Sequence, residues 1–191
     1  MKSVKGSETE KNLLKAFAGE SQARNRYTYF ASVAKKEGFE QISAIFLETA
    51  DNEKEHAKIF FNYLEGGDLE IDAKYPAGKI GKTSENLFAA ADGEKLEYSK
   101  LYPGFEKTAR KEGFLDIATS FKEIAEVEEE HEKRYRKLLE NVKNNEVFKK
   151  DKVVKWKCRN CGYVHEGREA PLICPACKHP RAFYEVLEEN Y

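Results

Sequence analysis

Apolar residues recur every three to four positions through most of the first 145 residues, which is the period of an α-helix. A first helix is predicted to begin at Ser7, which forms a capping-box pair with Glu10, and to continue up to Gly38. A second helix is predicted over residues 40–65, which end at Gly66. Because the connection between the two is short, the pattern predicts an antiparallel helical hairpin.

A second hairpin is expected after a long loop. The pattern predicts a helix over residues 85–112, capped by Ser84 and perturbed at Pro103-Gly104, and another over about 115–143. The 17 residues from 68 to 84 could reach roughly 56 Å when extended. A 25-residue helix is only roughly 37 Å long, so this loop can cross the whole bundle. One long crossover between two hairpins is the ferritin-like form of a four-helix bundle.

Charge and composition exclude several classes of protein. The 191 residues contain 33 Lys and Arg against 34 Asp and Glu, so we expect no basic face for nucleic acid or a membrane surface. No apolar run is long enough to span a bilayer, and the charged start MKSVKGSETEK lacks the apolar core of a secretory signal. We therefore expect a cytoplasmic protein without nucleic-acid or membrane partners.

The composition of the chain changes near residue 146. All four cysteines, three of the five prolines and the only tryptophan lie in residues 153–191, and the polar segment 144–152 is typical of a linker. The sequence therefore predicts two domains, a helical one over residues 1–146 and a small cysteine-nucleated one over residues 153–191.

The two predicted hairpins repeat each other at an offset of 75 residues, as in the segment KEGF at 36–39 and again at 111–114. The same offset relates Glu53 and His56 to Glu128 and His131. A Glu and a His three residues apart point to the same side of a helix, and these two pairs fall near the apolar stripe, where an unpaired carboxylate is costly. A shared core explains the apolar matches of the repeat but does not explain these two pairs.

Each Glu-x-x-His pair has an acidic partner on the preceding helix, Glu20 in the first half and Glu94 in the second. Two Glu-x-x-His helices with one Glu from each of the other two helices form the di-iron or di-manganese constellation of four-helix bundles. Oxygen and imidazole ligands suit iron or manganese, and carboxylates can bridge two ions. The sequence therefore predicts a dinuclear metal site inside the bundle.

One mismatch interrupts the repeat. Tyr27 and Tyr102 keep the offset of 75, whereas Glu20 and Glu94 are only 74 residues apart, so one residue has been added between Glu94 and Tyr102. A single insertion within a helix is absorbed as a π-bulge, which is often found at functional sites. Glu97 lies in this stretch and has no glutamate counterpart in the first half.

The cysteines form two pairs of the form Cys-x-x-Cys, Cys158 with Cys161 and Cys174 with Cys177. Two such knuckles can hold one ion tetrahedrally between four thiolates, which would also help a small domain to fold. A reduced compartment disfavours disulfides, and a thioredoxin-like βαβ setting is absent. The spacing favours zinc as the commonest occupant but does not distinguish it from a mononuclear iron–thiolate centre.

Taken together, these motifs resemble the rubrerythrin family. The resemblance rests on AGESQARNRY at residues 18–27, the duplicated Glu-x-x-His hairpins, CRNCGYVHEG at residues 158–167 and CPAC at residues 174–177. It implies an all-α ferritin-like bundle followed by a small, β-rich, rubredoxin-like iron–sulfur domain. It also implies a non-haem di-iron peroxidase that reduces hydrogen peroxide to water, with iron at the four cysteines.

The resemblance also implies roles for individual residues. Glu53 and Glu128 would bridge the two irons, His56 and Glu97 would serve the same iron in different redox states, and Tyr27 and Tyr102 would lie beside the cluster. The implied di-iron ligands are Glu20, Glu53, His56, Glu94, Glu97, Glu128 and His131, and Cys158, Cys161, Cys174 and Cys177 would bind the third iron. His165 and His179 have no duplicated partner and are predicted to be surface or loop residues.

The charge of the irons gives a reason for the predicted exchange at Glu97. Two ferrous ions carry four positive charges, which the carboxylates of Glu20, Glu53, Glu94 and Glu128 balance. Oxidation adds positive charge, so a fifth carboxylate becomes more useful in the ferric state. We therefore predict that Glu97 binds iron in the oxidised enzyme.

The resemblance implies an upstream electron donor, either rubredoxin or an NAD(P)H-dependent reductase, and a head-to-tail homodimer. Two other functions fit parts of the sequence. A ferritin-like ferroxidase would account for the bundle but not for the cysteine domain. A structural zinc-ribbon protein on a metal-stabilised bundle would account for both domains, and its zinc centre would be colourless.

Overall fold

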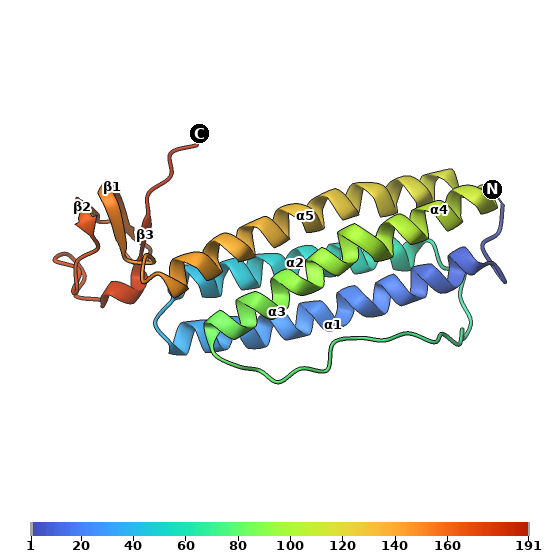
Figure 1. Cartoon of the computed structure of the whole chain (residues 1–191), viewed down its shortest axis with the longest axis horizontal. Helices are drawn as coiled ribbons and strands as arrows, with labels where there is room; N and C mark the ends of the chain where they lie inside the picture. Colours follow the sequence, from blue (N-terminus) through green and yellow to red (C-terminus); the bar gives the residue numbers. More distant parts are fainter. Residues whose placement is uncertain (1, 191) are drawn as a thin grey trace.

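The computed structural model describes residues 2–190 and shows a long four-helix bundle with a small sheet at one end (Figure 1). The first hairpin and the second hairpin lie side by side along the bundle. The helices are α1 (Glu8–Lys36), α2 (Glu40–Asn62), α3 (Thr83–Leu96), the π-helix η1 (Glu97–Leu101), α4 (Tyr102–Glu112) and α5 (Leu115–Lys143). The small domain contains β1 (Lys149–Cys158), β2 (Val164–Glu169), the 3-10 turn η2 (Arg181–Phe183) and β3 (Tyr184–Val186).

The crossover between α2 and α3 runs along the outside of α1 for most of the bundle's length (Figure 1). The Tyr75 hydroxyl fastens it there by donating a hydrogen bond of 2.8 Å to the carbonyl of Lys15. This connection leaves each pair of short-looped helices antiparallel, and the predicted ferritin-like bundle with its long crossover is confirmed. None of the described helices has the length and apolar character needed to cross a membrane.

The insertion predicted from the repeat is confirmed as a π-helix. η1 spans Glu97–Leu101 and joins α3 to α4 into one nearly continuous rod. Pro103 follows it in the first turn of α4, where its missing N–H removes no obligatory helical bond. The perturbation expected at Pro103-Gly104 therefore lies just before that pair, because the extra residue is accommodated in the preceding turn.

Two predicted helix ends were wrong. α2 stops at Asn62 rather than at residue 65, because the residues that follow leave the helix to pack elsewhere: Tyr63 and Leu64 lie against the core, and Glu65 binds the N-terminal segment. α3 starts at Thr83, so Ser84 lies inside the first turn and is not the cap. The Lys82 N–H donates to Glu85, while the Thr83 N–H donates to Glu37 at the end of α1.

The N-termini of α1 and α3 are each capped by a glutamate from the other half of the repeat. Glu37, in the turn of the first hairpin, accepts from the Thr83 N–H at the start of α3. Its repeat counterpart Glu112 accepts from the N–H groups of Glu8 and Thr9 at the start of α1 and from the Thr9 hydroxyl. Each hairpin thus supplies a carboxylate to the first helix of the other, where the helix dipole favours negative charge.

The bundle core has an apolar cluster on each side of a polar layer. The cluster nearer the sheet contains Tyr27, Phe30, Phe46 and Tyr135, and the cluster at the other end contains Phe60 and Phe121 with their neighbours. The layer between them contains buried Glu and His side chains from four helices. Because buried charge must be compensated, this layer is the place in the bundle where a ligand is expected.

The small domain is a three-stranded antiparallel sheet with the order β2-β1-β3. Its core holds Trp156, Tyr184, Cys158 and Cys174. β1 begins at Lys149, inside the segment 144–152 that was predicted as a linker, so part of that segment is a strand. The reason is a tertiary contact, since Phe148 stacks on Phe39 of the bundle with ring centroids 6.1 Å apart.

Candidate metal centres

Six residues of the predicted dinuclear site converge in the middle of the bundle. Each helix presents its ligands toward the axis because they continue its apolar stripe. All six are buried, and their carboxylates are fully shielded from solvent. α1 contributes Glu20, α2 contributes Glu53 and His56, α3 contributes Glu94, and α5 contributes Glu128 and His131.

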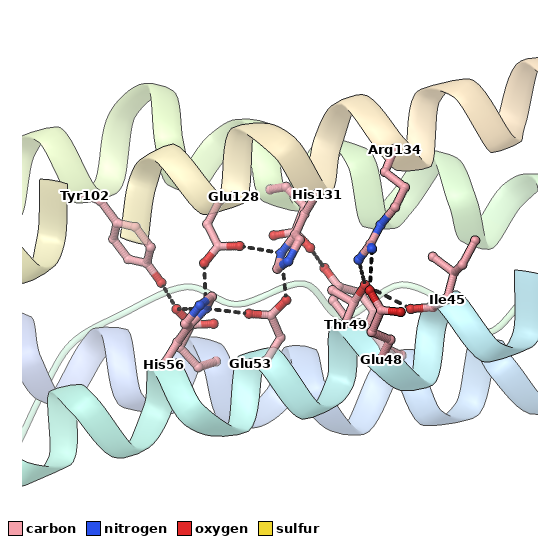
Figure 2. A network of polar contacts seen from close by, with 12 residues as sticks. Ile45, Glu48, Thr49, Glu53, His56, Tyr102, Glu128, His131 and Arg134 are labelled. Carbon is pink, nitrogen blue, oxygen red and sulfur yellow. Dashed lines mark hydrogen bonds and ion pairs between the residues drawn. The ribbon is translucent and has the colours of Figure 1, made fainter. Parts of the chain in front are cut away.

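Glu53 and Glu128 each divide their two oxygens between the two histidines (Figure 2). The His56 Nδ1 is 3.0 Å from Glu53 Oε2 and 2.8 Å from Glu128 Oε1. The His131 Nδ1 is 2.7 Å from Glu128 Oε2 and 3.2 Å from Glu53 Oε1. If each histidine nitrogen bound a metal ion, each ion would lie near one oxygen of Glu53 and one oxygen of Glu128. Carboxylates that bridge two ions have this arrangement.

The histidines carry the positive charge of the metal-free site. Burial alone would lower the pKa of His56, but hydrogen bonds to Glu128 and Glu53 outweigh it and raise the pKa to about 10. The same competition raises the pKa of His131 to about 9. Glu53 is affected in the opposite direction: burial opposes ionisation, but the two histidines lower its pKa to about 2.

Glu20 and Glu94 are each held by a tyrosine from a different helix. Tyr27 donates to Glu94 Oε1 at 2.5 Å, and Tyr102 donates to Glu20 Oε1. Burial is the main cause that raises the pKa of both tyrosines well above the usual value. The charge of Glu94 adds to this effect at Tyr27, and the charge of Glu20 adds to it at Tyr102, so both tyrosines stay protonated. Burial and the neighbouring carboxylates also raise the pKa of Glu20 and Glu94.

The side-chain atoms fit two metal ions. The second oxygens of Glu20 and Glu94 are buried without a hydrogen-bond partner among the described residues, which is costly unless a cation binds them. The donors form two groups whose atoms lie within 4.8 Å of one another, Glu20-Glu53-His56-Glu128 and Glu53-Glu94-Glu128-His131. Both groups contain Glu53 and Glu128, so two ions would share these carboxylates.

Glu97 lies beside this site but belongs to neither group of donors. It starts the π-helix and faces a cavity between α1 and α3. Burial, reinforced by the charges of Glu128 and Glu53, raises the pKa of this carboxyl to about 8. The structure therefore places Glu97 close enough to Glu53 and Glu128 for their charges to affect its pKa.

Arg134 and Thr49 were not identified from the sequence, although they adjoin the site. Arg134 follows His131 on α5 and donates to Glu48 at 2.6 Å and to the Thr49 hydroxyl at 2.7 Å (Figure 2). These contacts tie α5 to α2 one turn from the histidine. The repeat carried a signal for these two residues, because it breaks at both of them: Ile59 stands at the position that matches Arg134, and Ile124 at the position that matches Thr49.

The four cysteines of the small domain also converge. All four are free, and their sulfur atoms lie within 4.8 Å of one another. Each pair sits in a tight turn: the Gly162 N–H donates to the Cys158 carbonyl, and the Lys178 N–H donates to the Cys174 carbonyl. Gly162 and Lys178 adopt positive φ angles of 78° and 64° at equivalent places in these two turns. Four thiolates around one point fit a single tetrahedral ion.

The two remaining histidines lie in the small domain. His165 lies on the edge strand β2, where it pairs with Trp156 and is half-buried. His179 does lie in a loop, and its Nδ1 is 3.1 Å from the Cys177 carbonyl. Its closeness to the cysteine centre was missed, although its position two residues after Cys177 was a usable signal.

Comparisons with known proteins agree with this arrangement of two centres. The rubrerythrin family profile matches residues 11–139, and the profile of the rubrerythrin rubredoxin-like domain matches residues 156–185. The chain belongs to the rubrerythrin family. It therefore combines a di-iron bundle with a rubredoxin-like domain whose four cysteines bind one iron.

Individual relatives cover nearly the whole chain. A rubrerythrin of Porphyromonas gingivalis is 60% identical over 190 residues, which are 100% of this chain and 95% of that protein. A rubrerythrin of Nitratidesulfovibrio vulgaris is 59% identical over 191 residues and 100% of both chains. A solved structure of fully reduced, all-ferrous nigerythrin covers 97% of this chain and 92% of that one, with 29% identity and a TM-score of 0.63.

Proposed function

We propose that this protein is a non-haem di-iron peroxidase that reduces hydrogen peroxide to water and draws its electrons through the rubredoxin-like centre. The observation that carries the proposal is the presence of two different iron sites in one chain. A buried carboxylate–histidine site suits chemistry on oxygen, and a four-cysteine site suits electron transfer. An iron store or a ferroxidase alone would leave the second site without a role.

The proposed ligands follow from the donor groups. Glu53 and Glu128 would bridge the irons, Glu20 and His56 would complete one site, and Glu94 and His131 would complete the other. When bound in the ferrous state, the pair of irons supplies two electrons together, so that the O–O bond can be cleaved without release of a one-electron radical. The residues contribute a dry, preorganised cage in which the positions of all six donors are fixed by four packed helices.

Tyr27 and Tyr102 position the terminal carboxylates. Each tyrosine remains protonated and donates to one oxygen, which leaves the other oxygen of Glu94 or Glu20 available to an ion. The histidines lose their Nδ1 protons when metal binds, since a ligating imidazole must be neutral. Proton release to solvent on metal loading is therefore part of the proposal.

We propose that Glu97 is the mobile ligand. The π-helix begins at Glu97, whose carboxyl faces the cavity next to Gly19, the residue before Glu20 in the donor group that also contains His56. Oxidation adds positive charge to the irons, which favours a fifth carboxylate over the neutral imidazole of His56. Glu97 would thus bind iron in the oxidised enzyme and yield to His56 on reduction.

The route of the electrons points to a head-to-tail dimer. Along α5, Glu128 and the helix end at Lys143 are 15 residues apart, or roughly 22 Å at the helical rise. The small domain, which holds the four cysteines, lies beyond that end (Figure 1). Electron tunnelling falls steeply with distance, so the centre of the same chain is a poor donor. We propose that the small domain of one subunit serves the bundle of its partner, and that rubredoxin or an NAD(P)H-dependent reductase reduces it.

Anaerobic rapid mixing tests the proposal. The iron-loaded protein is fully reduced and then mixed with hydrogen peroxide, while the thiolate charge-transfer absorption and the di-iron absorption are followed separately. We expect the di-iron site to oxidise first, within the mixing experiment, and the four-cysteine iron to follow it. Oxidation by peroxide no faster than by dioxygen, with iron accumulating in the protein, would instead indicate a ferritin-like ferroxidase.

A further inference from the structure

A cavity adjoins the candidate di-iron site on the side of α1 and α3, and neither His56 nor His131 lines it. It has a volume of about 390 Å³ and is enclosed by α1, α3, the π-helix and the crossover. Its floor includes Glu97, Tyr27 and Tyr102. The proposed function does not explain its size, because hydrogen peroxide has only two heavy atoms and a water molecule occupies roughly 30 Å³.

Two glycines keep this cavity open. Gly19 and Gly93 precede the ligands Glu20 and Glu94 in the two halves of the repeat, and both line the cavity. A Cβ atom at Gly19 would meet Tyr75 at 3.7 Å and Glu97 at 3.8 Å, while a Cβ atom at Gly93 would meet nothing within 4 Å. Glycine inside a helix costs roughly 0.5–1 kcal/mol relative to alanine, so two glycines here are unfavourable for the helices unless the space itself is used.

The walls of the cavity are largely apolar. Leu96, Leu101 and Phe105 form one side, and the ring of Tyr75 closes the outer side from the crossover. Leu96 and Leu101 are also partly exposed to solvent, at 44% and 38%. The polar and charged side chains that also line the cavity are Lys15, Gln22, Arg26, Asp72, Lys74 and Glu97. An apolar pocket with a few converging polar groups is the usual form of a small-molecule site.

We infer that the cavity binds the organic part of hydroperoxides of the form ROOH, with R an alkyl or aryl group up to the size of cumyl. An apolar cavity of roughly 150 Å³ already holds benzene, so the present one accommodates a phenyl ring with its alkyl substituents. The peroxide oxygens would point to the floor and the group R would contact the leucines and Tyr75. The inference deepens the proposed peroxidase function and rests on it.

The reaction balances with the same reductant as for hydrogen peroxide. The O–O bond of ROOH breaks, two electrons come from the two ferrous ions, and two protons come from solvent. The products are one alcohol ROH, one water molecule and two ferric ions. The alcohol leaves through the cavity, where it has the same apolar contacts as the substrate.

Binding of the product alcohol provides a test that does not depend on turnover. Equilibrium dialysis of 2-phenyl-2-propanol against the oxidised, iron-loaded protein should show one site per chain. In Gly19→Leu, whose side chain extends from α1 into the cavity, we expect binding to weaken at least about tenfold, as misfit by a few methylenes does in apolar pockets. Gly104→Leu is the matched control, because Gly104 lies on α4 outside the cavity and a Cβ atom there meets nothing within 4 Å.

Turnover gives the second readout. Reduced protein mixed with cumene hydroperoxide should yield one 2-phenyl-2-propanol per di-iron site, and the ratio of kcat/KM for cumene hydroperoxide to that for hydrogen peroxide should fall at least about tenfold in Gly19→Leu. If Gly19→Leu does not assemble its irons, Tyr75→Ala removes the outer wall instead and should weaken alcohol binding.

The outcomes separate this inference from the proposed function. Reduction of hydrogen peroxide without binding of the alcohol or reduction of cumene hydroperoxide overturns the inference alone. Equal behaviour of Gly19→Leu and Gly104→Leu also overturns it. Failure of both peroxides to oxidise the di-iron site overturns the proposed function as well.

Discussion

At the scale of single residues, protons on the histidines compensate the buried carboxylates of the metal-free site, as metal ions would in the loaded site. The Nδ1 atoms of His56 and His131 lie between the oxygens of Glu53 and Glu128, so two imidazolium protons compensate two buried carboxylates. Glu20 and Glu94 are instead favoured in their neutral forms by burial. Both arrangements keep net charge out of the low-dielectric core, and both should depend on pH.

We predict that the stability of the metal-free protein falls as pH rises from about 6.5 toward 10. The folded-state pKa values of His56 and His131, about 10 and about 9, exceed the ordinary value of 6.5. Stability from these groups is therefore complete below pH 6.5 and is lost as pH rises through the folded-state values. The raised pKa values of Glu20 and Glu94 act in the same direction.

Urea unfolding followed by the helical circular dichroism signal would measure this. The denaturation midpoint of the metal-free protein should decrease steadily over that range. The iron-loaded protein is the control, and its midpoint should depend much less on pH because the ions have replaced the protons. A midpoint for the metal-free protein that is constant or rises with pH would contradict the charge arrangement described above.

At the scale of elements, the added residue of the second half shapes the site. It converts one turn into the π-helix Glu97–Leu101, and it leaves Glu94 and Tyr102 both pointing into the polar layer. Without it, the two residues would be spaced like Glu20 and Tyr27, and the turn would be α-helical. The element therefore presents Glu97 to the cavity without disturbing Glu94 before it or Tyr102 after it.

We predict that deletion of Ser99 converts η1 into α-helix and removes Glu97 from the cavity. Ser99 is exposed, and its deletion restores the spacing found in the first half of the repeat. The bundle should still fold and bind two irons, but a crystal structure of the oxidised variant should show no Glu97–iron bond. Ser99→Ala keeps the chain length and should retain the π-helix. An unchanged π-helix in the deletion variant would show that local sequence, rather than the count of residues, produces it.

The features that were predicted from the sequence are those that the internal repeat and the spacing between residues reveal. The ligand pairs, the bundle and the π-helix all follow from offsets of 74 and 75 residues, which are properties of the chain alone. The helix ends depended on distant partners: Glu37 caps α3, and Glu65 accepts from Val4. No local pattern carries that information, so the start of α3 and the end of α2 were predicted wrongly. The start of β1 was missed for the same reason, since Phe148 is anchored by Phe39.

The cavity was also beyond the reach of the sequence. Gly19 and Gly93 look like ordinary helix-interior glycines, and Tyr75 lies in a loop with no recognisable motif. Only the path of the crossover along α1 brings Tyr75 above Gly19. Sites that depend on the packing of a loop against a helix are set by tertiary structure, whereas ligand pairs on one helix are set by its period.

At the scale of the whole molecule, the two iron centres lie in separate units. The small domain lies at one end of the bundle (Figure 1), where Phe148 stacks on Phe39. The dinuclear site lies between the two apolar clusters of the bundle core. The fold of a single chain thus gives each site its own environment and keeps the two apart. A head-to-tail dimer would bring the sites of different subunits together.

We predict that two inactive variants restore activity when they share a dimer. Cys158→Ser loses the thiolate centre but keeps the bundle, and Glu128→Ala loses a carboxylate that belongs to both donor groups but keeps the small domain. Each homodimer should show no steady-state peroxide reduction with an external donor. In a mixed dimer, the intact small domain of one subunit would serve the intact bundle of the other, so co-expression should recover about a quarter of wild-type activity if the subunits pair at random.

A tagged purification isolates the mixed dimers and sharpens the measurement. Purified mixed dimers should reach about half of wild-type activity, because one of their two centre pairs is intact. Glu129→Ala replaces Glu128→Ala in the control, since the Glu129 side chain is 46% exposed, pairs with Lys133 and belongs to neither donor group. Electron transfer within one chain predicts the opposite result, because neither subunit of the mixed dimer has both centres, and the mixed dimers would then be as inactive as their parents.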